Sequence, residues 1–307
     1  MTARFGYCCI NMELQETKGI TCNKTMRKAT FEKKGLSYAS ELSLKNVTGL
    51  EKIIDWNIEK DLKVFRMSST LFPWASEYRW DDLPDIEEIR KIMSRTGKKA
   101  TEAGLRLSFH PGPFNCLTSE NPNAVLNCIR DLKMHGDMMD MFEQPRSHWA
   151  KINIHIGGAY GDRPSALARW CKNFDLLPES VKSRLTVEND DRKNLYSTKM
   201  LFDSIYKILQ VPIVFDSHHF ECGPEDASYE ESLAMAVASW PKGIRPMCHH
   251  SNSKKLYEDD TVNTYAAHSN YYYKPFRDLG YEVDVALEAK AKERALFKYR
   301  KDFIESK

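Results

Sequence analysis

Short apolar segments alternate with longer amphipathic segments along most of the chain. Eight runs rich in β-branched or apolar residues are expected to form strands: 4–11, 64–68, 105–110, 152–155, 185–188, 212–216, 245–249 and 283–288. Between them, segments with the apolar spacing of surface helices include 44–61, 86–104, 123–142, 198–209 and 289–305. Eight strand–helix units in one chain predict an α/β fold of the TIM type, a (β/α)8 barrel.

A doubly wound sheet is the alternative arrangement of such units. It would be expected to carry a glycine-rich phosphate-binding turn after an early strand, and neither G-x-G-x-x-G nor G-x-x-x-x-G-K-[ST] occurs. Because the chain has no low-complexity tract or long linker, we predict a single domain covering 1–307 with no nucleotide cofactor. Residues 17–43 lack an obvious core of their own and are predicted to form a long first loop at the C-terminal rim.

Composition excludes some classes of protein. Hydrophobic residues make up 42% of the chain and charged residues 29%, which is typical of a soluble globular protein and not of a disordered or membrane-spanning one. The net charge is only +2, so an anionic partner would have to meet a local basic patch. The eight cysteines form no C-x-x-C pair and the N-terminus has no signal-peptide apolar run. We therefore expect free thiols in a reducing intracellular compartment, and no secretion.

Ionisable residues concentrate at the ends of the predicted strands, where a TIM barrel holds its active site. They are His110, His155, Glu188, Asp216, His219, His249 and Glu288, with His268 in the loop before the last strand. Burying several carboxylates without partners is costly, so such a cluster indicates cation binding. Mixed imidazole and carboxylate ligands without thiolate favour Zn²⁺, Mn²⁺ or Fe²⁺.

The predicted metal residues leave the reaction open. Two ions bridged by a carboxylate can lower the pKa of a water and stabilise both oxygens of an in-line displacement, which favours hydrolysis of a phosphodiester. The same residues could polarise a sugar carbonyl and its hydroxyl for isomerisation.

Several ordered motifs resemble those of a known family. They are GYCCIN, VFRMSSTLFPWAS, LSFHPGPFNCL, NIHIGGAYGDRPSALARW, NFDLLPESVKSRLTVENDD, VPIVFDSHHF, RPMCHHS and DVALEAKAKE. Over nearly its whole length the chain thus resembles the UV-damage endonucleases of the UvdE type, which are similar to endonuclease IV. The resemblance implies a metal-dependent DNA repair endonuclease that hydrolyses the phosphodiester immediately 5′ to a lesion such as a UV photoproduct.

The resemblance also implies which residues bind metal. Glu188, Asp216 and Glu288 would be the catalytic residues, with Glu188 bridging two ions. The implied sites are a first with His110 and His155, a second with Asp216, His249 and Glu288, and a third with His219 and His268. The expected cofactors are two or three divalent ions, with Mn²⁺ favoured over Zn²⁺ and Mg²⁺.

The partner implied by the resemblance is damaged double-stranded DNA, bound by a monomer without a membrane. Tyr7 and Asn11 match positions that contact the damaged nucleotides, and Phe114 matches an aromatic probe. A basic run in the predicted first loop, with Lys24 and with Arg27 and Lys28, is expected to contact DNA phosphates.

Two positions depart from the family pattern. Pro113 stands where the family has a glutamine that would fill the space opposite the lesion, so the preferred lesion is left open. Met247 stands where the family has a lysine close to the metals, so the number and identity of the ions are left open as well.

Other histidines and aromatic residues are expected to be structural. His218 and His250 neighbour predicted ligands and should point away from them, because side chains alternate along an extended segment. His135 and His148 lie away from strand ends. For the aromatic residues after the second strand, packing is favoured over lesion contact: Phe72, Trp74, Tyr78 and Trp80.

Three other functions compete with the UV-damage endonuclease. The nearest is an apurinic-site endonuclease, which needs the same metals. The second is a metal-dependent sugar isomerase or epimerase, against which the aromatic and basic loops weigh. The third is a damage-binding protein with a decayed metal site, which the complete set of His, Asp and Glu ligands argues against.

Overall fold

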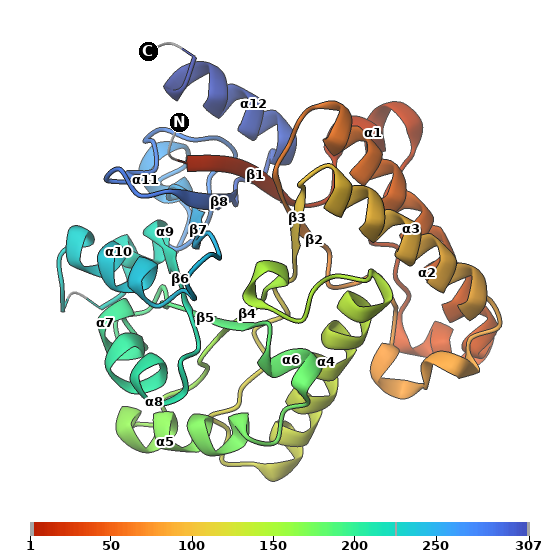
Figure 1. Cartoon of the computed structure of the whole chain (residues 1–307), viewed down its shortest axis with the longest axis horizontal. Coiled ribbons are helices and arrows are strands. Elements are labelled where there is room, and N and C mark those ends of the chain that lie inside the picture. Colours follow the sequence, from red (N-terminus) through yellow and green to blue (C-terminus); the bar gives the residue numbers. More distant parts are fainter. Residues whose placement is uncertain (1–2, 225, 306–307) are drawn as a thin grey trace.

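Eight parallel strands form the centre of the molecule in the computed structural model, which describes residues 3–224 and 226–305 (Figure 1). The strands are β1 (Ala3–Cys9), β2 (Val64–Met67), β3 (Arg106–Ser108), β4 (Ile152–His155), β5 (Leu185–Glu188), β6 (Ile213–Asp216), β7 (Met247–His250) and β8 (Val283–Leu287). Their order is β3-β2-β1-β8-β7-β6-β5-β4, and a bridge between Phe109 and Ile152 brings the two edge strands together. The predicted TIM-type barrel is confirmed.

Helices surround the strands, as the amphipathic segments predict (Figure 1). The α-helices are α1 (Met12–Lys18), α2 (Lys28–Glu59), α3 (Ile86–Glu102), α4 (Pro122–Met141), α5 (Arg163–Phe174), α6 (Glu179–Lys182), α7 (Thr198–Leu201), α8 (Lys207–Leu209), α9 (Ser217–Cys222), α10 (Tyr229–Ala238), α11 (Lys254–Tyr257) and α12 (Lys292–Phe303). The described residues also form three 3₁₀ turns, η1 (Ala75–Glu77), η2 (Trp80–Asp82) and η3 (His148–Ala150). One π-helical turn, η4 (Phe202–Tyr206), lies between α7 and α8.

Local sequence signals set where the helices begin. The side chain of Asn121 caps α4 by accepting from the Asn123 amide, and Pro122 follows as the first helical residue. Ser228 and Glu231 form a reciprocal capping box at the start of α10.

The N-terminal end of the barrel is closed by a buried charge cluster. The fully buried guanidinium of Arg106 lies 3.0 Å from the Asp284 carboxylate and packs against the rings of Trp149 and Trp240. Arg4 pairs with the same carboxylate at 2.6 Å. Because this end is filled, the space for chemistry lies at the other end, where the strands finish.

The predicted long first loop is partly wrong. Within residues 17–43, α2 begins at Lys28, with a change of direction at Gly35, whose φ is +65°. The segment has no core of its own, but Phe31 stacks on Trp74 from the loop after β2, with ring centroids 6.1 Å apart. Trp74 also donates from its indole nitrogen to the Met26 carbonyl. This partner is distant in sequence, so hydrophobic periodicity within the segment does not reveal it.

The aromatic residues after β2 are packed, as predicted. Phe72 and Trp80 meet edge to face with centroids 4.8 Å apart, and the indole of Trp80 donates to Asp137.

Two further observations concern the cysteines and the helices. All eight cysteines belong to the described part of the chain, and all are free thiols. Within residues 3–224 and 226–305, no helix combines the length and the apolar character needed to span a membrane.

Candidate active site

The carboxylate of Glu188 lies at the centre of a ring of imidazoles. This residue ends β5 and is fully buried. His110 Nε2 lies 2.9 Å from its Oε2, and His249 Nδ1 lies 3.0 Å from its Oε1. His155 and His219 approach the same carboxylate at 3.8 and 3.4 Å. Four predicted ligands from four separate segments therefore converge on a fifth.

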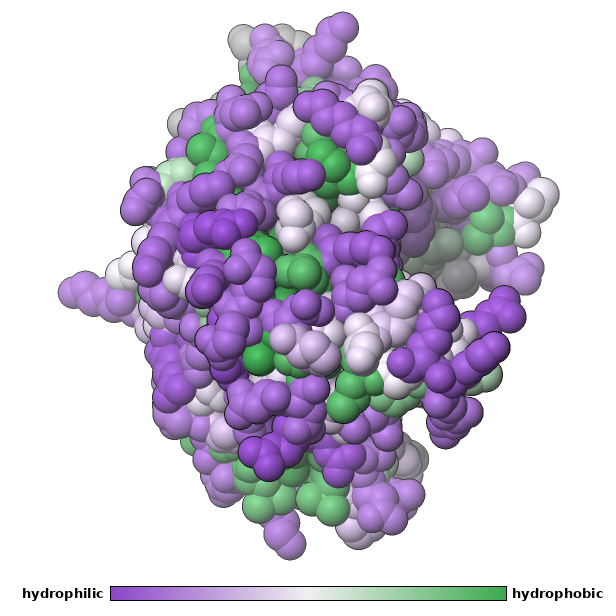
Figure 2. All heavy atoms as spheres, turned by 90° about the vertical axis from the view of Figure 1, so that its right-hand side faces the viewer, coloured by the Kyte–Doolittle hydropathy of each residue, from purple (hydrophilic) through white to green (hydrophobic). Residues whose placement is uncertain are grey.

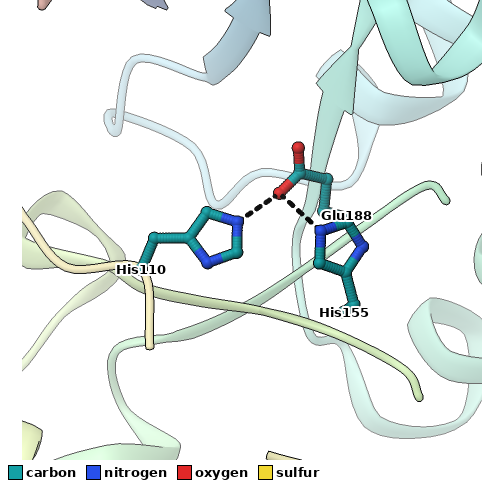
Figure 3. Close-up of side chains that lie close together, drawn as sticks. All are labelled: His110, His155 and Glu188. Carbon is teal, nitrogen blue, oxygen red and sulfur yellow. Dashed lines mark hydrogen bonds and ion pairs between the residues drawn. The ribbon is translucent and has the colours of Figure 1, made fainter. Parts of the chain in front are cut away.

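Two groups of three residues have the geometry of metal sites. In the first, ligand atoms of His110, His155 and Glu188 all lie within 4.8 Å of one another (Figure 3). The second consists of Glu188, Asp216 and His249, with the same spacing. Glu188 belongs to both groups, so its two carboxylate oxygens serve neighbouring positions.

The residues of this cluster fit divalent cations. Asp216 Oδ1 accepts from the amides of His218 and His219, but Asp216 Oδ2 is buried without a hydrogen-bond partner among the described residues. Leaving a buried carboxylate oxygen unpartnered is costly, and a cation would satisfy it. Imidazole and carboxylate donors without thiolate suit Mn²⁺ or Zn²⁺.

Glu288 joins the cluster from the end of β8. Its Oε1 lies 3.1 Å from His249 Nδ1 and forms an ion pair with Arg66 of β2. Burial opposes the charge of this carboxylate, but Arg66, His249 and His268 together outweigh burial and hold the pKa of Glu288 well below its usual value. Arg66 was not predicted as a site residue, although a charged residue within an apolar strand could have indicated a buried ion pair.

A buried lysine stands beside the cluster even though Met247 replaces the family lysine. Lys151, just before β4, is fully buried, and its Nζ lies 3.1 Å from His249 Nε2. Burial lowers the pKa of Lys151 to about 7. Met247 instead packs with Val64 and Trp240 in a small apolar cluster. A lysine ammonium group therefore lies beside the cluster although position 247 is a methionine.

The proposed third site is less compact than the first two. His268 lies in the loop between β7 and β8, with its ring centroid 6.3 Å from that of His219 and 5.3 Å from that of His218. Its Nδ1 is buried without a partner among the described residues. His268 therefore reaches the edge of the cluster formed around Glu188.

The surroundings shift the pKa values of the imidazoles in opposite directions. Burial lowers the pKa of His110 to about 4, although Glu188 opposes the shift. Burial also opposes the charge of His155, but the carboxylates of Glu188 and Asp190 raise its pKa to about 10. Burial works against the charge of Glu188 too, and the surrounding imidazoles hold the pKa of this carboxyl well below its usual value.

Two further residues that support the cluster, beside Arg66 and Lys151, were not predicted. Asp190 Oδ1 lies 3.1 Å from His155 Nδ1, on the ring edge opposite the Glu188 side. Asn153 donates from its amide to Glu188 Oε2. Asn153 precedes His155 by two residues on β4, so the two-residue period of a strand could have placed both on the inner face.

Tyr7 and Asn11 lie away from the cluster, against α2. Tyr7 is fully buried, packs on Phe65 and Trp56, and donates its hydroxyl proton to Asn57 at 2.8 Å. Asn11 is buried as well, caps α1 and donates to the Tyr7 hydroxyl at 3.0 Å. Both side chains are occupied by contacts within the protein.

Phe114 and Pro113 lie in the loop after β3. Phe114 is 73% exposed, an unusual state for a large apolar ring. Pro113 lines a groove of about 520 Å³ that also includes His155, His219 and Arg192. The groove leads from the predicted ligands to the surface.

Three of the histidines expected to be structural have partners within the protein, with one difference from expectation. His250 uses both nitrogens, on the Ser217 hydroxyl and the Lys274 carbonyl, and His135 bonds the Asp131 carbonyl within α4. His218 is in the short helix α9 and not in an extended segment, so the reason given for its direction was wrong. Its Nε2 lies 3.2 Å from the Ala266 carbonyl oxygen.

Fold and site together define a TIM barrel with a carboxylate-centred cluster of possible metal ligands. The chain matches the family UV-endonuclease UvdE over residues 3–307. A UV DNA damage endonuclease of Bacillus velezensis is 30% identical over 97% of this chain and 93% of that protein. The chain therefore belongs to the UvdE family.

Solved structures agree with this assignment. The crystal structure of SacUVDE superimposes with a TM-score of 0.83 and 26% identity, covering 99% of each chain. Endonuclease IV from Thermus thermophilus gives a TM-score of 0.58 at 13% identity, covering 99% of this chain and 100% of that one. At that identity the second likeness concerns the fold alone.

Proposed function

We propose that this protein is a divalent-metal-dependent endonuclease that hydrolyses the phosphodiester immediately 5′ to a UV photoproduct in duplex DNA. The observation that carries the proposal is the Glu188 carboxylate shared by two ligand groups, in a chain of the UvdE family. It is supported by the relative from Bacillus velezensis, a UV DNA damage endonuclease.

The protein would hold two or three divalent ions, Mn²⁺ before Zn²⁺ or Mg²⁺. His110, His155 and Glu188 would hold the first, and Glu188, Asp216, His249 and Glu288 the second, while His219 and His268 would hold a third. Bound ions would supply the positive charge that activates a water and stabilises a phosphoryl transition state.

The chain's own residues prepare this arrangement. Amides at the start of α9 hold Asp216 Oδ1, which leaves Oδ2 for a cation. Arg66 holds Glu288, and Asn153 holds Glu188, so both carboxylates are oriented before substrate binds. No covalent intermediate with the protein is required, because water is the nucleophile.

Damaged DNA would lie across the C-terminal rim, with Phe114 pressed against bases unstacked by the lesion. Its exposure supports this role, because aromatic rings stack on bases of any sequence. Tyr7 and Asn11 remain proposed contacts to the damaged nucleotides. In the structure they hold the end of β1 against α2, so their contact with DNA would require them to be uncovered.

Replacing Phe114 tests the lesion contact. We expect Phe114→Ala to weaken binding of a photoproduct-containing duplex about tenfold, because stacking on a base is worth roughly 1–3 kcal/mol. Binding of undamaged duplex should change much less. Ile208→Ala, which removes another exposed apolar side chain from α8, is the control. Equal losses on damaged and undamaged DNA would contradict the role.

Replacing Glu188 tests the catalytic centre. We expect Glu188→Gln to slow nicking of UV-irradiated duplex by about 100-fold or more, because the amide removes the charge shared by both ligand groups. The control is Glu102→Gln, the same change at an exposed position near the end of α3. Turnover at the wild-type rate in Glu188→Gln would reject the bridging role.

A further inference from the structure

A hollow lined by four lysines lies between the α1–α2 loop and the side of α2. Its volume is about 290 Å³, and its polar lining includes Lys18, Thr21, Lys24, Lys45, Thr48 and Lys52. None of its lining residues is acidic. We call this hollow the lysine pocket.

Tight packing between the loop and the helix builds the walls of the lysine pocket. A Cβ atom at Gly49 of α2 would come within 2.0 Å of the Thr21 carbonyl oxygen, so this approach requires glycine. The fully buried Asn46 accepts from the Lys24 amide at 2.8 Å and donates to the Lys24 carbonyl at 2.9 Å. The lysines on loop and helix are therefore held along one concave surface.

Most of the positive charge in the lysine pocket is uncompensated. Lys45 pairs with Glu41 at 2.5 Å. For Lys18, Lys24 and Lys52, the described residues provide no carboxylate within ion-pair distance. A concave surface lined by charges of one sign raises the local concentration of the opposite ion. The lysine pocket therefore has the character of an anion site.

The lysine pocket lies at the same end of the barrel as the metal-ligand cluster. The Cys22 thiol donates to the carbonyl of Cys9, the last residue of β1. Asn46 also donates to the carbonyl of Leu71, in the loop that follows β2. The pocket thus borders the C-terminal rim from outside the barrel wall, on the side of α2. The face that carries α2 and α3 is mostly hydrophilic (Figure 2).

We propose that the lysine pocket binds a backbone phosphate of the DNA duplex to one side of the lesion. The inference rests on the proposed function, because it takes duplex DNA lying across the rim as the substrate. Ammonium groups bind phosphate without reading sequence, so the pocket would position the duplex and strengthen binding to damaged and undamaged DNA alike. Of the basic run in the predicted first loop, Lys24 lines the pocket, whereas Arg27 and Lys28 do not.

The test compares two double variants that each remove two positive charges. Lys24→Gln with Lys52→Gln alters the lysine pocket. Lys60→Gln with Lys242→Gln alters exposed lysines that precede β2 and β7, at the opposite end of the barrel. Binding is measured without added metal over a range of salt concentrations, on duplexes reaching at least one helical turn beyond the lesion, and circular dichroism confirms folding.

Log affinity falls as log salt concentration rises, and we expect this negative slope to become shallower by about two in the pocket variant, one for each lysine. The ratio of affinities for damaged and undamaged duplex should stay at the wild-type value, and the control variant should keep the wild-type slope. An unchanged slope in the pocket variant, with nicking intact in the wild type, would overturn the inference alone. A wild type that neither binds nor nicks damaged duplex would overturn the proposed function as well.

Free inorganic phosphate is the other anion of this chemistry that the lysine pocket could bind, and a melting experiment distinguishes it from a DNA phosphate. If phosphate raises the melting temperature of the wild type but not of the pocket variant, while the two salt slopes are equal, the pocket serves free phosphate. That result would overturn the assignment to DNA.

Discussion

At the scale of single residues, several side chains contact the proposed metal ligands and hold them in place. Asp190 is almost fully buried and lies against the ring nitrogen of His155 that faces away from Glu188. A carboxylate in this position fixes the tautomer and the direction of a metal-binding histidine. Lys151 occupies the corresponding position on His249.

The contact between Asp190 and His155 leads to a prediction about metal affinity. We expect Asp190→Asn to weaken Mn²⁺ binding roughly 10- to 100-fold, because the amide no longer stabilises the same orientation and charge of the imidazole. Calorimetric titration of the metal-free protein measures this affinity. Asp191→Asn makes the same change one residue further on, where the side chain is only partly buried, and should bind Mn²⁺ normally. Equal affinities in both variants would show that Asp190 does not position His155.

The predictability of the site residues follows from strand geometry. His110, His155, Glu188 and Asp216 could be predicted because each stands at a strand end, where polar residues interrupt an apolar run. Arg66 and Asn153 lie further back along β2 and β4, and Lys151 lies just before β4. An isolated sequence shows the alternation of side chains along a strand, but it does not show which inward polar side chains reach across the barrel to a common point. The burial of Tyr7 depends on contacts with α2, far along the chain, and could not be predicted.

At the scale of elements, the structure departs most from expectation in the first part of α2, which lies within the segment predicted to be a long loop. The strands could be predicted to within a few residues, because their apolar runs are short and bounded. The first part of α2 could not, because its packing partner is the loop after β2. A charged contact joins α2 to α3. Both carboxylate oxygens of Glu51 on α2 accept hydrogen bonds of 2.7 Å from Arg95 on α3, and Lys99 Nζ lies 3.2 Å from Glu51 Oε1.

The link through Glu51 leads to a prediction about stability and pH. The hydrogen bond from Arg95 lowers the pKa of Glu51, although burial opposes the shift. A carboxyl whose pKa is lower in the folded state stabilises the fold above its unfolded pKa of about 4.3, and this contribution is lost as the pH falls through the folded value. At pH 7, Glu51→Gln should therefore lower the free energy of unfolding by up to about 1 kcal/mol.

Urea unfolding at pH 7 and at pH 4 checks this prediction. The difference between wild type and Glu51→Gln should shrink at the lower pH, because the carboxyl is protonated more readily in the unfolded state, and this lowers wild-type stability as the pH falls below about 4.3. Glu102→Gln, at an exposed position on the neighbouring helix α3, should change stability little at either pH. A difference of the same size at both pH values would contradict the ionic link.

At the scale of the whole molecule, the net charge is only +2, but acidic and basic residues gather in different places. Glu188, Asp216 and Glu288 gather inside the rim, whereas the lysine pocket lies outside it. Such an arrangement suits a substrate whose scissile phosphate is held through cations while flanking phosphates meet lysines directly. Overall charge could not predict this division, because it depends on where the barrel places each segment.

The most direct test of the central claim maps where DNA is cut. Three matched duplexes carry a single UV photoproduct, an abasic site or no damage, and each is incubated with Mn²⁺, Mg²⁺ or Zn²⁺ in turn. We predict one nick in the photoproduct strand, at the phosphodiester immediately 5′ to the lesion, that requires an added ion and is absent from undamaged DNA. Absence of nicking with every ion, or cleavage confined to the abasic duplex, would contradict the account.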